Sequence, residues 1–390
     1  MILRGARVAL GAESSERIDL EIRRGHVRWT GRSGDGRELN LDGHLILPGL
    51  INCHDHLEFN LFPRLGHGPY PNAAAWAEDI YRPDRSPVKE QLAVPKAIRL
   101  IWGGVKNLLS GVTTVAHHNP YEPAVFQQDF PVRVVERFGW AHSLRFCPDL
   151  VDRFRATPKR WPFLVHAAEG IDARAASEIR ELDEAGVLTS RTVVIHGVAV
   201  GCDALRILLQ RRAALVWCPS SNLFLLSRTV RPEVLHSGLA IGLGTDSALT
   251  GQGDLACELK VARTAGQLSA EEIYPMVTTQ AARILRIKRG EGEIRDDGLA
   301  DLLVVADAGQ SPAQALQEYS PDLVILGGRI QLISERLAPK IHSKLTAHLY
   351  RIDVDGRGSW LVNVDVARLV QATEPVLGPN FRLAGRRVRA

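Results

Sequence analysis

The chain has 390 residues, of which 45% are hydrophobic and 24% charged, and its mean hydropathy is −0.06. These are ordinary globular values, and they exclude a disordered, collagen-like or disulfide-framework protein. The 48 basic and 44 acidic residues leave a net charge of only +4, so we expect no nucleic-acid partner. At roughly 150 residues per domain, the length allows two or three domains, or one large α/β domain with an appendage.

Membrane and secretory features are not expected. No apolar run approaches the roughly 18 residues that a membrane-spanning helix needs, and Arg4, Arg7 and Glu13 interrupt any signal-peptide core. The five cysteines are scattered and form no C-x-x-C pair, which argues against disulfides and against a cysteine zinc site. The sequence therefore predicts a cytoplasmic protein with reduced thiols and no membrane partner.

The first part of the chain is rich in short strands. Apolar and polar residues alternate at residues 18–22 and 27–29, which is typical of antiparallel strands. The pattern changes after Pro48-Gly49. A helical period covers residues 93–109, Gly111 stands at the position of a helix C-terminal glycine, and the β-branched residues 112–115 predict a strand.

The middle of the chain alternates strands and helices. The pattern predicts strands at residues 163–166, 193–196, 215–217 and 240–243, with helices at residues 172–185 and from Asp203. Apolar strands separated by single helices indicate βαβ units on a parallel sheet. Residues 46–284 are close to the roughly 250 residues of a (β/α)8 TIM barrel, so we expect this α/β fold, whereas no G-x-G-x-x-G supports a doubly wound sheet. Too little chain separates residues 131–133 from 141–144 for a full helix, so the third and fourth units are expected to be abbreviated.

The last part of the chain returns to short strands. Ser269 and Glu272 have capping-box spacing ahead of a helix that we expect to reach Leu285. Residues 292–294, 300–305 and 323–329 then predict strands, and residues 335–390 are expected to add further strands or an interface. Because both ends share this texture, we predict that residues 1–45 and 285–390 pack together as one small β domain beside a barrel of residues 46–284.

Metal-capable residues follow several of the predicted strands. His54 and His56 are two apart after an apolar run, so both imidazoles can face one point at the carboxyl end of that strand. His166, His196 and Asp246 each end or follow another predicted strand. Because the carboxyl ends of barrel strands meet at one rim, these side chains predict a divalent-metal site. Imidazole and carboxylate ligands without thiolate suit Zn2+ or Fe2+, and they do not separate the two.

Glu169 lies three positions beyond His166. That offset gives the opposite face of a continuing strand, so Glu169 reaches the pocket only if the chain has already turned into the loop. In that position its carboxyl group can serve as a proton shuttle.

The ordered motifs of this chain resemble those of the amidohydrolase superfamily, and within it the mononuclear deaminase and chlorohydrolase group that contains cytosine, guanine and S-adenosylhomocysteine deaminases. The matching segments are LPGLINCHDH at 47–56, SGVTTV at 110–115, HAAE at 166–169, IHG at 195–197, CPSSN at 218–222, GTDS at 244–247, GEI at 292–294 and ADL at 300–302. The resemblance implies a TIM barrel with a composite β-sandwich that is built from both chain ends.

The resemblance also implies roles for the site residues. One metal ion would be bound by the ligands His54, His56, His166 and Asp246. His196 would contact the hydrolytic water or the tetrahedral intermediate, and Glu169 would be the general acid/base. Asp246 would also orient the water and accept its proton. Lys159 precedes the His166 strand in a polar stretch and does not fit the position of a carbamylated lysine, which favours a single metal, with Zn2+ expected first and Fe2+ as the alternative.

We therefore expect a hydrolase of carbon–nitrogen bonds other than peptide bonds, in particular an aminohydrolase. A divalent cation lowers the pKa of bound water towards about 7, and the resulting hydroxide would attack a nitrogen heterocycle and release ammonia. Hydrolysis of a cyclic amide, an N-acyl bond or a carbon–chlorine bond is the alternative, because it uses the same activated water. A metalloprotein without activity is disfavoured because every expected ligand and Glu169 are present.

Candidate substrate contacts are Trp76, which can stack on a ring, His117 or His118, which point to opposite faces, and Arg145, which can bind a carboxylate or carbonyl. Packing or an ion pair is the alternative for each of them, and for Phe224 packing is preferred. The expected partner is a small-molecule substrate, and relatives in this group are commonly homodimers or larger.

Overall fold

Eight parallel strands form two adjacent sheets in this computed structural model, which describes residues 1–29 and 38–390 apart from the side chain of Lys344. One sheet has the order β10-β9-β8 and the other has the order β11-β12-β13-β14-β15. Their bounds are β8 Leu50–Asp55, β9 Val112–His117, β10 Arg133–Val134, β11 Gly139–Ser143, β12 Phe163–Ala167, β13 Thr192–His196, β14 Ala214–Trp217 and β15 Ala240–Leu243. The expected α/β class is confirmed.

The two sheets approach each other at one side. The backbone N–H groups of Thr245 and Asp246, which follow β15, both donate to the carbonyl of His54 in β8. Within the described residues, no strand pairing links β10 to β11, so the ladder is not continuous there. No helix separates these two strands, as expected for abbreviated units, because only four residues lie between them.

Helices connect and cover these strands. They are α1 Ala73–Ile80, α2 Val88–Ala93, α3 Lys96–Leu108, α4 Leu150–Ala156, α5 Ala173–Glu184, α6 Cys202–Arg211, α7 Pro219–Leu226, α8 Pro232–Leu235, α9 Leu255–Gly266, α10 Ala270–Ile273 and α11 Thr279–Ile284. The strand residues alternate between two apolar clusters because successive side chains point to opposite faces. Ile51, Val193 and Val216 pack with α11, whereas Leu50, Val194 and Leu215 belong to the cluster that includes the outer helices.

Several predicted elements match the structure closely. The strand at 163–166 is β12, and the helix at 172–185 is α5, whose N-cap Asp172 accepts a hydrogen bond from the Ala175 N–H. The helix expected over residues 93–109 begins only at Lys96, because Pro95 at the N-cap is extended and separates α3 from α2.

Two predictions for residues 269–294 are wrong. The helix from Ser269 starts with the expected capping box but is broken into α10, a 3-10 turn at Tyr274–Val277 and α11. Pro275 lacks the N–H that a continuous helix needs there. Residues 292–294 form no strand: Gly292 has φ +77°, and a Cβ there would approach the Thr278 carbonyl to 2.6 Å, so this segment is a tight turn against the backbone of Thr278.

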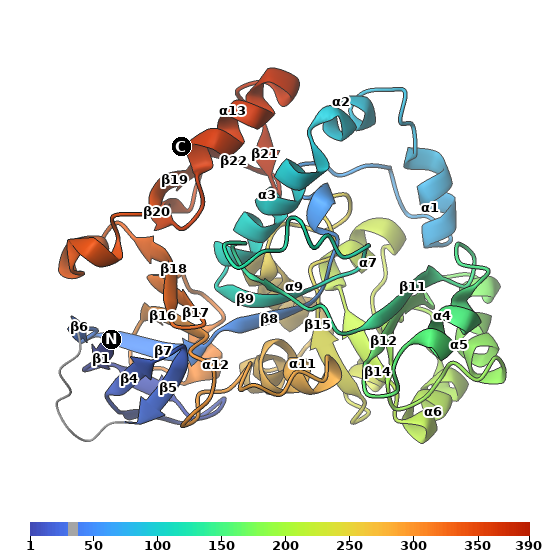
Figure 1. Ribbon diagram of the computed structural model, residues 1–390. Helices are drawn as coiled ribbons and strands as arrows, with labels where there is room; N and C mark the ends of the chain where they lie inside the picture. The colour runs from blue at the N-terminus through green and yellow to red at the C-terminus, as the bar shows by residue number, and fades with distance from the viewer. Residues whose placement is uncertain (30–37) are drawn as a thin grey trace.

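Both ends of the chain enter one ten-stranded sheet, on the left of Figure 1. Its order is β21 Arg382–Leu383, β22 Arg386–Arg389, β19 Tyr350–Val354, β20 Gly358–Val362, β18 Arg329–Ser334, β17 Leu323–Leu326, β16 Leu302–Ala306, β7 His44–Pro48, β2 Arg7–Ala9 and β3 Ser15–Arg17. The central pairing joins β16 to β7 in antiparallel register, with Leu303 opposite Leu47.

A second sheet of four strands packs against the first through a shared apolar cluster. Its order is β5 His26–Trp29, β4 Leu20–Arg23, β1 Ile2–Arg4 and β6 Glu38–Asn40. Residues 335–390 contribute β19 to β22 and helix α13 Val366–Leu377, which contacts α3 through a Trp102 Nε1–H to Thr373 hydrogen bond of 2.9 Å. The short helix α12 spans Pro312–Ala315. Among the described residues, no helix is long and apolar enough to cross a membrane.

Candidate active site

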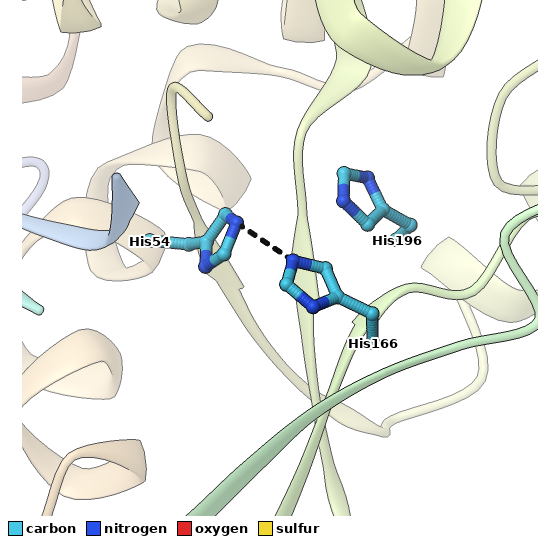
Figure 2. A group of neighbouring side chains, drawn as sticks. All are labelled: His54, His166 and His196. Atoms are coloured by element: carbon cyan, nitrogen blue, oxygen red, sulfur yellow. Dashed lines mark hydrogen bonds between the residues drawn. The ribbon is translucent and has the colours of Figure 1, made fainter. Parts of the chain in front are cut away.

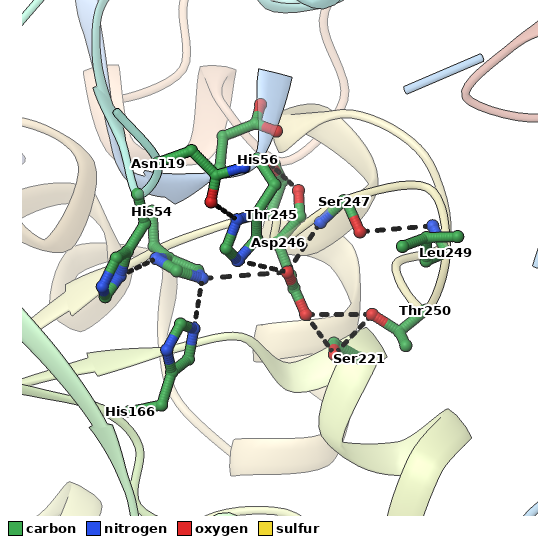
Figure 3. Close-up of polar contacts among 12 residues, drawn as sticks. His54, His56, Asn119, His166, Ser221, Thr245, Asp246, Ser247, Leu249 and Thr250 are labelled. Carbon is green, nitrogen blue, oxygen red and sulfur yellow. Dashed lines mark hydrogen bonds and ion pairs between the residues drawn. The ribbon is translucent and has the colours of Figure 1, made fainter. Parts of the chain in front are cut away.

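Five of the predicted site residues come together at the carboxyl ends of the parallel strands (Figures 2 and 3). His54, His166 and His196 offer ligand atoms that lie within 4.8 Å of one another, and so do His54, His56 and Asp246. His54 belongs to both groups, so the five side chains surround one small space. All five are buried, although they come from four separate parts of the sequence.

The shortest contacts in this cluster join ring nitrogens to one another or to a carboxylate oxygen. Without a cation between them, such atoms repel each other or attract each other only weakly. His54 Nε2 lies 3.3 Å from His166 Nε2, and both His54 Nε2 and His56 Nε2 lie 3.7 Å from Asp246 Oδ1. Each Nε2 atom either carries a proton and donates, or carries a lone pair and accepts. Which of the two applies follows from the hydrogen bond that the other ring nitrogen, Nδ1, makes.

Hydrogen-bond acceptors hold the Nδ1 atoms of His56 and His166. His166 Nδ1 lies 2.8 Å from the carbonyl oxygen of His142, and His56 Nδ1 lies 3.0 Å from Asn119 Oδ1. An oxygen acceptor requires a proton on each Nδ1. In a neutral ring the Nε2 atom then carries a lone pair instead of a proton, and both Nε2 atoms face the cluster.

His54 and His196 follow the same rule. His118 Nε2 lies 3.1 Å from the Ala141 carbonyl, so it carries the proton, and His118 Nδ1 accepts at 3.2 Å from His54 Nδ1. His196 Nδ1 lies 2.8 Å from Asn222 Oδ1. Four Nε2 lone pairs thus converge on one space, which is the arrangement that a metal ion requires.

Burial keeps His54 and His166 neutral, whereas the imidazoles around Asp246 keep its carboxylate charged. Desolvation lowers the pKa of His54 to about 4 and that of His166 well below its ordinary value. Burial alone would raise the pKa of Asp246, but its contact with His54 and with the other neighbouring imidazoles holds it well below its ordinary range. Ser221 and Thr250 hydroxyls also donate to Asp246 Oδ2, at 2.7 and 2.9 Å. At neutral pH, His54, His166 and Asp246 are therefore already in the protonation state that metal binding requires.

Glu169 reaches the cluster because the chain turns directly after β12. Ala168 has φ +55°, a left-handed conformation that is strained for alanine, and its N–H donates at 2.7 Å to Glu178 Oε2. The turn places Glu169 Oε1 3.3 Å from His196 Nε2. Burial, then the charges of Asp246 and Glu178, raise the pKa of Glu169 well above its ordinary value, so this carboxyl group holds a proton that it can donate.

The four candidate substrate contacts have other partners in the structure. Trp76 donates its indole N–H to the Leu65 carbonyl at 2.8 Å, and Arg145 forms an ion pair with Glu78. Arg145 nevertheless lines the cavity that also contains His166 and Glu169.

His117 and His118 are both buried. His118 stands behind His54, where it accepts the hydrogen bond described above. His117 Nδ1 accepts from the Leu57 N–H at 3.2 Å, and its Nε2 lies 3.5 Å from Glu58. Phe224 packs under the Arg64 guanidinium at 4.8 Å, in agreement with the preferred packing role.

The sequence reasoning missed the residues that orient the cluster. Glu178 and Asn119 belong to this class, and so does the buried ion pair of 2.7 Å between Lys106 and Asp55. Asp55 carried a signal, because it stands between His54 and His56, whereas Glu178 lies on a helix without a motif.

Comparisons with known proteins agree with this fold and site. Residues 163–331 match the amidohydrolase family. The chain is 25% identical over 329 residues to a 5-methylthioadenosine/S-adenosylhomocysteine deaminase from Natronomonas pharaonis, covering 70% of this chain and 75% of that protein. It is 24% identical over 376 residues to the enzyme of the same name from Pyrococcus furiosus, covering 78% and 86%.

Solved structures share the fold. An adenosine deaminase from Xanthomonas campestris with bound zinc has a TM-score of 0.75 at 16% identity, over 96% of this chain and 97% of that one. The atrazine chlorohydrolase TrzN from Arthrobacter aurescens, complexed with zinc, has a TM-score of 0.73 at 18% identity, over 96% and 99%. The family match and the deaminase relatives confirm the resemblance to amidohydrolases and their deaminase members, and the solved structures show the shared fold. The expectation of a hydrolase of carbon–nitrogen bonds is confirmed with it, and a divalent metal is supported.

Proposed function

We propose that this chain is a metal-dependent aminohydrolase that releases ammonia from a nitrogen heterocycle, with one divalent cation held by His54, His56, His166 and Asp246. The observation that carries the proposal is the convergence of neutral Nε2 lone pairs and one carboxylate on a single buried space. We infer Zn2+ as the ion because the donor set is imidazole and carboxylate without thiolate, and Fe2+ is the alternative.

A cation held by His54, His56, His166 and Asp246 would supply Lewis acidity to a water molecule. Asp246 takes a proton from that water, because its carboxylate is charged and its Oδ2 is held by two hydroxyl groups. Glu169 donates its proton to a ring nitrogen of the substrate, which prevents negative charge from building up on the ring. The proton on Asp246 passes to the amino group, which leaves as ammonia, and the ring nitrogen returns its proton to Glu169. His196 lies next to Glu169 and binds the oxygen that is added to the ring.

We infer an adenine-type nucleoside as the first substrate class to test, because the curated relatives include 5-methylthioadenosine/S-adenosylhomocysteine and 5'-deoxyadenosine deaminases. Hydrolysis of a carbon–chlorine bond is the second candidate, supported by the fold shared with TrzN. The two reactions differ in product: the first releases ammonia and the second releases chloride. Cyclic amides and N-acyl bonds complete the set that the same activated water can hydrolyse.

The testing experiment is a screen of the zinc-loaded full chain against adenosine derivatives, other purines, pyrimidines, chlorotriazines and cyclic amides. Ammonia release coupled to replacement of the amino group by oxygen, read by mass spectrometry, supports the proposal. Chloride release alone, or ring opening alone, refutes deamination in favour of the alternative. Elemental analysis of active protein then separates zinc from iron.

We further propose that the two parallel sheets form one (β/α)8 barrel over residues 46–284, and that residues 1–45 and 285–390 form the composite β-sandwich. The support is the hydrogen bonding of Thr245 and Asp246 to β8 and the entry of both chain ends into one sheet. A cytoplasmic location, a homodimer or larger homo-oligomer, and the absence of nucleic-acid and membrane partners remain predictions from the sequence.

A further inference from the structure

A large groove lies at the end of the barrel opposite to the metal cluster. Its volume is about 940 Å3, and it is lined by Arg133 at the start of β10, by Pro162 directly before β12, and by residues 285–289 and Glu291, which follow α11. Residues 326–331 of the ten-stranded sheet form its other wall. Since His166 stands near the far end of β12, about 13 Å of strand at 3.3 Å per residue separates the groove from the proposed active site.

The groove concentrates positive charge. Arg133 is neutralised by Asp301, but six other cations on the lining have no carboxylate partner within residues 1–29 and 38–390. They are Arg137, Arg160, Arg286, Lys288, Arg289 and Arg329. Two carboxylates, Glu136 and Glu291, line the same groove, so the local surplus is four positive charges, as large as the net charge of the whole chain.

The cations surround an apolar wall. Tyr121, Phe126, Phe130 and Trp161 line the groove. Arg160 and Arg329 are exposed, which leaves both guanidinium groups free to contact a ligand. A second cavity of about 790 Å3 shares Arg160 and extends the basic surface.

We propose that this groove binds an organic polyphosphate with an aromatic body, such as a nucleoside triphosphate. A guanidinium group can donate two parallel hydrogen bonds to the oxygens of one phosphate group. Several guanidinium groups in one groove therefore suit a ligand with several phosphate groups better than a ligand with a single carboxylate. The aromatic wall provides a surface on which a planar base can stack. The groove volume lies within the range of small-molecule sites. This site is independent of the proposed deamination, because it shares no lining residue with the metal cluster.

The probe is UTP, which carries no ring amino group and is therefore not a substrate of the proposed reaction. Isothermal titration calorimetry of the zinc-loaded full chain at about 0.15 M salt, where exposed charges are screened within about 8 Å, measures specific rather than diffuse binding. We expect UTP to bind more tightly than tripolyphosphate, and uridine to bind weakly. The double variant Arg160→Glu/Arg329→Glu should lose about tenfold or more in affinity for each arginine contact removed.

The matched control is Arg23→Glu, which reverses an exposed cation in β4 that has no ion-pair partner among the described residues, and it should leave UTP affinity unchanged. Thermal melting of each variant verifies that the fold is kept, and Arg160→Gln with Arg329→Gln removes the charges without reversing them. Absence of UTP binding, equal affinity of the double variant, or equal affinity for UTP and tripolyphosphate would overturn the proposal. Concentration-dependent dimerisation that the double variant abolishes, without UTP binding, would assign the groove to a second copy of the chain.

Discussion

Replacing His118 by phenylalanine tests whether the metal cluster is oriented from behind. His118 Nδ1 accepts from His54 Nδ1 at 3.2 Å, and its ring stacks on His166 with centroids 4.3 Å apart at 16°. Phenylalanine keeps a flat ring of similar size but accepts no hydrogen bond, so the stacking is retained and the tautomer of His54 is no longer fixed.

The size of the effect follows from the two bonds that are lost. His118 is fully buried, so the His54 Nδ1–H and the Ala141 carbonyl would both lose their partners without access to water. Each unsatisfied group costs about 1–3 kcal/mol, so we expect the free energy of unfolding to fall by about 2–6 kcal/mol. Loss of a hydrogen bond behind a metal-binding histidine typically weakens metal affinity about 10–100-fold.

Zinc affinity is measured by competition with a chromophoric chelator, and the unfolding free energy by urea denaturation of the metal-free protein. The control is His236→Phe, which changes an exposed histidine outside the cluster and should alter neither quantity. A His118→Phe variant with unchanged zinc affinity and a raised KM would refute the positioning role and restore His118 as a substrate contact.

Three further predictions follow from the geometry of the site and of the ten-stranded sheet. Glu169→Gln should lower kcat about 100–10,000-fold while elemental analysis still finds the metal, because only the proton donor is lost. Glu178→Ala should lower kcat about tenfold, whereas Glu178→Gln keeps an acceptor for the Ala168 N–H and should retain most activity. Asp322 is buried, accepts from Ser334 and Arg336, and has its pKa held below the ordinary range despite burial, mainly by the hydrogen bond to His44. Asp322→Asn should therefore cost about 3–5 kcal/mol at pH 7, and the difference from the parent should shrink as the pH falls below about 4 in equilibrium unfolding. A difference that grew in acid would contradict this assignment.

Many of the parallel strands and their helices could be predicted from the sequence because their signals are local. β12 and α5 were predicted from an apolar run and from the cap Asp172, and both depend only on neighbouring residues. The break at Pro275 also had a local signal, the missing N–H of proline, but the helix was predicted through it. The turn at Gly292 was misjudged for the opposite reason. The approach of Gly292 to the Thr278 backbone is a contact between segments 14 residues apart, and no local pattern indicates it.

The candidate site divides in the same way. His54, His56 and Glu169 stand in recognisable motifs, so the sequence indicates the chemical role of each. The groups that fix the tautomers of the histidines do not stand in recognisable motifs. His166 depends on the backbone carbonyl of His142, and a carbonyl is present at every residue, so the sequence cannot mark the one that acts.

The orientation of the cluster is therefore a property of the fold rather than of a motif. The strands β11 and β12 are parallel neighbours with a register shift between Ala141 and Ser143, and this irregularity lies where the Ala141 and His142 carbonyls meet His118 and His166. A bulge frees carbonyl groups from the ladder, and those carbonyls become acceptors for imidazole N–H groups. Two of the four converging lone pairs thus depend on one local irregularity in strand pairing. The His166 lone pair depends on the His142 carbonyl directly, and the His54 lone pair depends on the Ala141 carbonyl through His118. Any substitution that restores regular pairing of β11 with β12 should weaken metal binding even if every metal-binding side chain is kept.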